Sequence, residues 1–341
     1  MKNLLNEVHK TVSKMNTKLT TKLLIALLVL LVATPIIGAG CQEGRGQPPA
    51  SSSPSALSST LVPNTPLDVY IYAKQDSPTK IPAEMIDAPN DIEVESGALW
   101  GVPAEDGFAF GMGLTLTSAS DASKLYAEIR LEENSWKLLS GNTIYLVLGS
   151  GSAAESLKRV ISNKDFKYYD DSESLQIAAT LPSGDTTKLA AIAIAKPSKA
   201  LIGFIAKDVD PEGLGLINMI LKLVNLKVIA GGLYSPQQID IAKMARVIES
   251  EGSILNLDLG LLVLVKSGLP GLIVEPAVKK LLTEKGFTET SLGGFTLYKG
   301  SWDTGGGKVM PILVRIEGNY IFAAISGQES YAETLITRVS K

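Results

Sequence analysis

The side chains that could do chemistry are unevenly distributed along this chain of 341 residues. The single histidine is His9 and the single cysteine is Cys41, so residues 42–341 contain neither an imidazole nor a thiol. This inventory excludes Ser-His-Asp and Cys-His catalysis, metal sites built on histidine or thiolate, and internal disulfides. The catalytic groups that remain possible are carboxylate pairs, lysines, tyrosines or an oxygen-ligated metal. We therefore predict a protein that is not an enzyme, and we assign no catalytic residue, no metal ligand and no cofactor.

A glycine-rich turn at residues 149–154 imitates part of a dinucleotide-binding fingerprint. It reads Gly-Ser-Gly-Ser-Ala-Ala, lies between a predicted strand and a predicted helix, and is followed about twenty residues later by Asp170 and Asp171. The related turn at residues 326–329 reads Ser-Gly-Gln-Glu, which lacks the glycine spacing and has a carboxylate where a pyrophosphate would bind. We interpret the turn as a structural feature of a repeat.

Two other segments have the composition of a ligand site without its spacing. Residues 168–173, Tyr-Tyr-Asp-Asp-Ser-Glu, could hold calcium or a sugar, but they do not fit the helix-loop-helix calcium motif. Residues 305–308, Gly-Gly-Gly-Lys, lack the first glycine and the following Ser or Thr of a phosphate-binding loop. We interpret the first segment as a solvated strand end or turn and the second as a loop between strands.

An apolar region between residues 200 and 226 is the candidate site for a hydrophobic ligand. Residues 214–226 would be apolar nearly all around as a helix, and residues 200–205 are also apolar. Such a helix is usually central in its domain, but it can also line an apolar groove or meet a partner. The residues of this possible ligand site are Leu201, Ile202, Phe204, Ile217, Ile220 and Leu221.

Residues 1–40 have the layout of an export leader. Five lysines precede residue 23, and residues 23–33 form an uninterrupted apolar run. The sequence Gly38-Ala39-Gly40-Cys41, which follows, resembles the lipobox of bacterial lipoproteins. This resemblance implies cleavage before Cys41, a lipid on its thiol, and a location on the extracytoplasmic face of the cell membrane. An uncut transmembrane anchor and free secretion are the alternatives.

A segment rich in Ser, Pro and Gly follows the cysteine. Residues 42–65 contain no large apolar side chain before Leu61 except Leu57. This composition buries too little surface to offset the entropy of ordering the chain. We therefore predict that residues 41–65 form a lipidated cysteine and a flexible linker, with the membrane as the partner that the lipid anchor contacts.

Residues 66–341 are predicted to form an α+β repeat domain. Residues 141–150 align without gaps with residues 318–327, and each segment begins with Gly-Asn and precedes a helix. The order strand-helix-strand-strand-helix is expected twice, and a looser copy lies between. The predicted repeat units are about 107–163, 187–250 and 255–341. We predict antiparallel sheets covered on one face by helices, preferably as one continuous sheet.

Individual elements of the two clearer units follow from apolar periodicity. We expect strands at residues 108–117 and 259–265, and helices at residues 121–131 and 274–285. The last helix of each unit should be buried through one apolar face. The residues of these two faces are Leu157, Val160, Ile161, Ala332, Leu335, Ile336 and Val339.

The pattern is similar to that of a family of exported bacterial proteins known only as a domain of unknown function. The similarity lies in the strand that leads into the helix at residues 115–122 and in the Phe-Thr-Leu-Tyr strand at residues 295–298. It spans about residues 66–341. The resemblance implies no activity, because the family has none assigned.

The charge of the chain argues against a nucleic-acid partner. Residues 41–341 contain 27 Lys and Arg and 34 Asp and Glu, a net charge of about −7, so there is no basic footprint for a phosphate backbone. We predict a membrane-anchored envelope lipoprotein with a non-catalytic binding or structural role. A carrier of lipids or other hydrophobic ligands and a carboxylate-dependent hydrolase are the alternatives.

Overall fold

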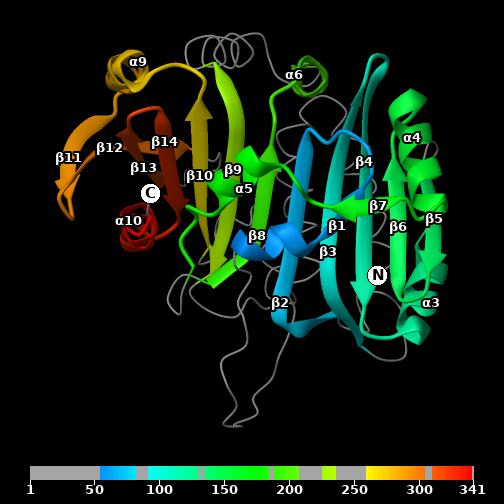
Figure 1. The fold of residues 1–341 in the computed structure, drawn as a ribbon. Coiled ribbons are helices and arrows are strands. Elements are labelled where there is room, and N and C mark those ends of the chain that lie inside the picture. The colour runs from blue at the N-terminus through cyan, green and yellow to red at the C-terminus, as the bar shows by residue number, and fades with distance from the viewer. Residues whose placement is uncertain are drawn as a thin grey trace.

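The computed structural model describes most of the chain beyond residue 53 (Figure 1). The described residues are 54–81, 91–129, 131, 135–183, 188–206, 225–235, 259–303 and 309–339. The predicted leader and Cys41 therefore lie outside the described residues, as do residues 305–308 of the Gly-Gly-Gly-Lys segment.

A twelve-stranded antiparallel sheet forms the centre of the molecule, with the strand order β11-β12-β13-β14-β10-β9-β8-β2-β3-β4-β6-β5. Its strands are β2 (Val69–Ile81), β3 (Ile92–Ala104), β4 (Gly107–Leu116), β5 (Ser135–Ser140), β6 (Thr143–Leu148), β8 (Lys188–Ala195), β9 (Leu226–Ser235), β10 (Gly260–Ser267), β11 (Thr288–Leu292), β12 (Phe295–Asp303), β13 (Val309–Glu317) and β14 (Tyr320–Ser326). Strands β1 (Leu61–Pro63) and β7 (Phe166–Tyr168) form a separate antiparallel pair.

The described helices cover both faces of this sheet (Figure 1). They are the 3-10 helix η1 (Pro54–Ser59) and the α-helices α3 (Ala119–Glu128), α4 (Gly151–Ser162), α5 (Ser172–Ala178), α6 (Lys199–Ala206), α9 (Gly271–Glu284) and α10 (Glu329–Thr337). The predicted α+β class and the continuous sheet are confirmed, but the prediction that helices cover one face is wrong. Side chains alternate between the two faces of a strand, and both faces of this sheet carry apolar residues that need covering. The four expected elements correspond to β4, β10, α3 and α9, with ends that differ by a few residues.

The topology divides the sheet into two related halves. The order β2-β3-β4-α3-β5-β6-α4 matches the order β8-β9-β10-α9-β13-β14-α10, if α6 between β8 and β9 and the strand pair β11–β12 are taken as insertions. The first strands of the halves, β2 and β8, are antiparallel neighbours, as an approximate two-fold axis perpendicular to the sheet requires. The predicted units 107–163 and 255–341 are thus the later parts of two larger halves. The described part of the predicted middle unit, 187–250, begins the second half.

The two Gly-Asn turns, at residues 141–142 and 318–319, show that the two halves of the sheet also correspond in their hydrogen bonds. Gly141 and Gly318 have positive φ angles of 63° and 59°, which a residue with a Cβ adopts less readily. Asn142 Nδ2 donates to Leu116 O over 2.6 Å, and Asn319 Nδ2 donates to Ser267 O over 3.1 Å. Each asparagine therefore joins a hairpin turn to the end of the strand next to it in the same half.

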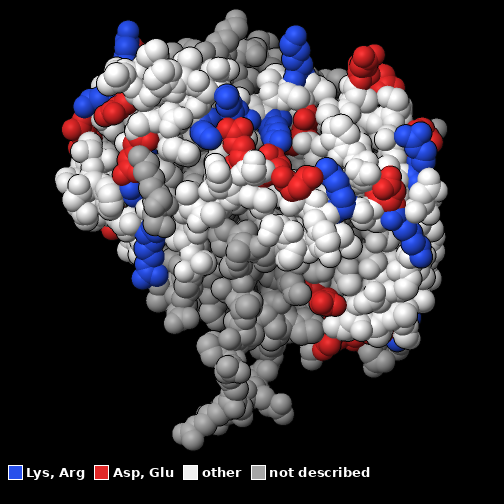
Figure 2. Space-filling model, in the orientation of Figure 1, with Lys and Arg blue, Asp and Glu red and all other residues white. Residues whose placement is uncertain are grey.

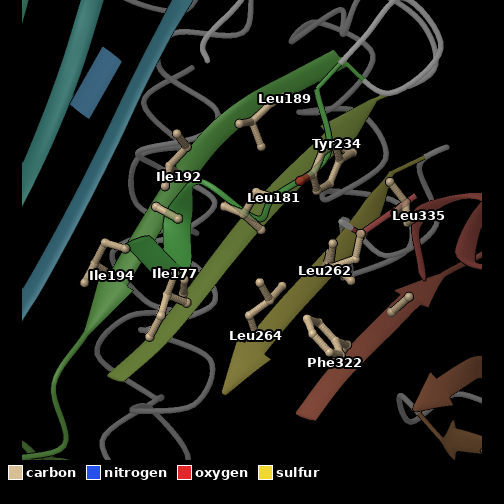
Figure 3. Close-up of a cluster of buried hydrophobic side chains, with 14 of the residues drawn as sticks. Ile177, Leu181, Leu189, Ile192, Ile194, Tyr234, Leu262, Leu264, Phe322 and Leu335 are labelled. Atoms are coloured by element: carbon tan, nitrogen blue, oxygen red, sulfur yellow. The ribbon is translucent and has the colours of Figure 1, made fainter. Parts of the chain in front are cut away.

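The largest core lies between the sheet and the layer formed by η1, α5 and α10 (Figure 3). Ile192 and Ile194 on β8, Leu264 on β10 and Phe322 on β14 point to the same face, because they are cross-strand neighbours or alternate along a strand. The predicted apolar faces are confirmed. Their residues Leu157, Val160 and Ile161 on α4 and Ala332, Leu335, Ile336 and Val339 at α10 are all buried.

The predicted flexible linker is wrong for residues 54–65. Leu57 in η1 is completely buried, Val62 in β1 is 1% exposed, and Pro63 pairs with Phe166. Thr60 Oγ1 donates to Leu57 O and accepts from the Tyr70 hydroxyl on β2. Tertiary burial thus orders a segment whose Ser- and Pro-rich composition suggested a spacer, and residues 41–53 lie outside the described residues.

Two buried tyrosines give a matched test of this packing. Tyr70 donates to Thr60 over 2.5 Å, whereas the buried hydroxyl of Tyr234 has no hydrogen-bond partner among the described residues. Tyr70→Phe should lower the free energy of unfolding by about 1 kcal/mol, because it removes a buried hydrogen bond. Tyr234→Phe should leave it unchanged or raise it, because it removes an unsatisfied hydroxyl. Urea unfolding of both variants measures the difference, and equal losses would contradict it.

Candidate ligand-binding groove

An open groove of about 590 Å³ lies beside α4. Its lining residues are Thr65, Val102, Pro103, Ala104, Ser152, Ala153, Glu155, Ser156 and Arg159. The end of β3 forms one wall, and one side of α4 forms the other. Its volume is within the range of small-molecule sites, which is roughly 300 to 1,000 Å³.

The spacing of residues on α4 explains the two kinds of surface in the groove. Ser152, Ser156 and Arg159 are three or four residues apart, so their side chains lie along one side of the helix. Leu157 and Ile161 are on the opposite side and pack on the sheet. The groove therefore combines an apolar wall from residues 102–104 with hydroxyl, carboxylate and guanidinium groups from α4.

A carboxylate from the chain itself occupies the beginning of α4. Asp106, in the turn between β3 and β4, accepts hydrogen bonds from Ser152 N at 2.8 Å and from Ser152 Oγ at 2.5 Å. Gly151 has φ +81°, and a Cβ at this position would lie 2.7 Å from Asp106 Oδ2. Gly151, part of the spacing that imitates a dinucleotide fingerprint, thus leaves room for Asp106. The Asp106 carboxylate occupies the position at the beginning of α4 where a phosphate would bind.

Asp106 should make the stability of the domain depend on pH. The two hydrogen bonds from Ser152 hold the pKa of Asp106 below its usual value. A carboxyl with a lowered folded-state pKa stabilises the fold above its unfolded pKa of about 4, and this contribution is lost as the pH falls through the folded value. We expect Asp106→Asn to be less stable than the parent at pH 7, with the difference shrinking below about pH 4. Thermal melts of the parent and of Asp106→Asn between pH 7 and pH 3 test this expectation. A difference in stability that stays constant across this pH range would contradict it.

The acidic residues at 168–173 form ion pairs at the surface, whereas Tyr169 in the same segment is buried in the core. Asp170 pairs with Lys167, and Glu173 pairs with Lys266 over 2.9 Å. Asp171 pairs with Lys196; burial alone would raise the pKa of Asp171, but hydrogen bonds from Lys196 and Ser174 lower it overall. Figure 2 shows acidic and basic side chains side by side on this face. The described residues contain no group of three or more metal-ligating side chains that could hold an ion.

The candidate residues for an apolar ligand are not brought together in the described residues. Leu201 on α6 is 4% exposed and packs with Val69 and Ile71 on the other face of the sheet, so it is a core residue. Ile202 is half-buried. Phe204 belongs to α6, but its side chain is outside the description, and Ile217, Ile220 and Leu221 lie outside the described residues.

A buried carboxylate joins β2 to the beginning of α6. Asp68 accepts a hydrogen bond from the hydroxyl of Ser198, and the oxygen of that hydroxyl accepts from Leu201 N over 3.1 Å. Burial raises the pKa of Asp68, while Ser198 and the charge of Lys196 oppose this rise. The arrangement begins the helix with a capping hydroxyl, which is a structural role.

Comparisons with known proteins identify no family. No family model matches the chain, and no curated protein sequence matches it. Two solved structures, crystal forms III and IV of TP0453, are similar to the chain with a TM-score of 0.34 each. Form III is 9% identical over 81% of this chain and 96% of that chain, and form IV is 10% identical over 82% and 98%. These values are too low to carry a functional argument.

No helix among the described residues is long and apolar enough to cross a bilayer.

The sequence analysis did not identify the groove residues Ser156 and Arg159 as part of a site. Their polar spacing on α4 is visible, but residues 102–104, which complete the groove, are about fifty positions earlier in the chain. A contact of this kind depends on the tertiary fold, and local periodicity gives no signal for it.

Proposed function

We propose that this protein is a lipid-anchored, non-catalytic binding protein of the bacterial envelope. The observation that carries the proposal is the position of the only cysteine, Cys41, between an apolar leader and the described domain, whose first described element begins at Pro54. Residues 41–53 would span at most about 45 Å when fully extended. A lipid on Cys41 would therefore keep the domain close to the membrane surface.

The composition of the groove favours binding over hydrolysis. Among its described lining residues only Glu155 carries a carboxylate, whereas a carboxylate-dependent hydrolase needs two that face one substrate. The apolar wall at residues 102–104 and the polar side of α4 suit a small molecule with an apolar body and a polar end. We therefore propose the groove beside α4 as the ligand site, in place of the region 200–226.

Native mass spectrometry of protein purified from its own cells tests both the lipid on Cys41 and the ligand in the groove beside α4. We expect a chain that begins at Cys41 with the added mass of lipid, together with a small molecule that is released on denaturation. Ser156→Trp, which fills the groove, should lose this molecule, and Ser162→Trp on an exposed part of α4 should retain it. An unmodified Cys41 would reject the lipid anchor. A molecule that Ser156→Trp retains would reject the groove.

A further inference from the structure

Two large apolar side chains are exposed together at the beginning of α9. Leu272 is 92% exposed and Ile273 is 55% exposed, and both belong to the first turn of the helix. Figure 1 shows α9 at the end of the sheet where β10 finishes. Isolated apolar residues on a surface are ordinary, but two adjacent ones on a projecting turn form a small apolar tip. We call Leu272 and Ile273 the α9 tip.

The α9 tip is held in a fixed position by the residues around it. Val274 is completely buried and Val278 is 5% exposed, so the next turns of α9 are anchored in the core. Gly271 packs so closely on Gly318 that an added Cβ would lie 2.5 Å from the Gly318 Cα. The backbone therefore holds the side chains of Leu272 and Ile273 in exposed positions, and no change in the helix is needed for them to contact a partner.

The other half of the sheet shows that the fold does not require apolar residues here. Helix α3 follows β4 as α9 follows β10, and the fourth residues of the two helices, Ala122 and Val274, are both completely buried. At the second and third positions α3 has Ser120 and Asp121, whereas α9 has Leu272 and Ile273. The exposed apolar pair is thus specific to one half, which indicates a contact outside the domain.

We propose that the α9 tip inserts into the surface of the membrane to which the protein is anchored; this inference rests on the proposed lipid anchor. The first described residues lie beside β2, where Thr60 contacts Tyr70, and three strand spacings, roughly 15 Å, separate β2 from β10. A tether of at most about 45 Å can therefore bring this end of the sheet to the bilayer. Two apolar side chains give a weak contact alone, but a tether raises their effective concentration at the membrane.

The test uses the chain from residue 41 onward with Cys41→Ser, held on phosphatidylethanolamine and phosphatidylglycerol vesicles by an N-terminal histidine tag on a nickel-chelating lipid. A polarity-sensitive fluorophore is attached at Leu272→Cys or, as the matched control, at Ser120→Cys. At position 272 we expect a blue shift and loss of about half the emission when nitroxide lipids are included, with neither effect at position 120. The effects should persist in high salt, because the contact is apolar.

Equal, water-like emission at both positions on vesicles would overturn the inference, as would an effect that high salt abolishes. A blue shift that grows with protein concentration in the absence of vesicles would indicate contact with a second copy and would also overturn it. Because the tag supplies the tether, these results do not depend on whether cells attach lipid to Cys41. A failure of the lipid anchor and a failure of membrane insertion are therefore distinguishable.

Discussion

Leu57→Ala should lower the free energy of unfolding by about 3 kcal/mol, although Leu57 lies in a segment with the composition of a linker. The side chain is completely buried, and its cluster includes Tyr70, Ile177 and Leu181. Removing it would leave a cavity beneath η1 that these neighbours can close only in part. Equilibrium unfolding in urea measures the loss.

Leu61→Ala is the matched control, because Leu61 is four residues further on and 54% exposed. It should change the stability by less than about 0.5 kcal/mol. An equally small effect of Leu57→Ala would contradict the packing of residues 54–65 on the domain, because this segment would then belong to the tether.

Arg315→Ala should destabilise the domain by about 2 to 3 kcal/mol, since it removes a buried donor and leaves buried carbonyl groups without their hydrogen bonds. Arg315 on β13 is 4% exposed and pairs with Glu317. Its Nη1 donates to Ile336 O at 3.2 Å and Val339 O at 3.4 Å, which satisfies carbonyls at the end of α10. The guanidinium also lies 3.7 Å from the centre of the Phe295 ring.

Two variants show whether the charge or the geometry of Arg315 matters. Arg315→Lys keeps the charge but loses the forked hydrogen bonds, so it should retain only part of the stability. Arg159→Ala removes an exposed arginine from the groove and should change stability by less than about 0.5 kcal/mol. If Arg315→Ala were as stable as Arg159→Ala, the hydrogen bonds from the Arg315 guanidinium would not stabilise the end of α10.

Local patterns predicted the elements that are stabilised locally. Apolar residues at helical spacing indicated α4 and α10, and the Gly-Asn pairs at 141 and 318 marked the start of two aligned segments. The alignment of these segments also indicated an internal repeat. The larger halves were missed because the sequence relates mainly their last elements, and strand order shows the rest.

Long-range contacts account for what the sequence did not predict. Residues 54–65 are ordered by burial of Leu57 against a distant part of the chain, and composition alone contains no signal for that burial. The groove depends on residues 102–104 lying against α4. The helix predicted at residues 274–285 begins after Leu272 and Ile273, and only the structure places these two residues in the first turn of α9 and shows that they are exposed.

A lipid on Cys41 should hold this domain at the membrane, and the cellular location of a Cys41→Ser variant shows whether it does. Fractionation should find the parent in the membrane with fatty acid attached, and the variant either released or left as an uncleaved precursor without lipid. The contradicting result is a Cys41→Ser chain that is cleaved and retained like the parent, with no fatty acid detectable on the parent.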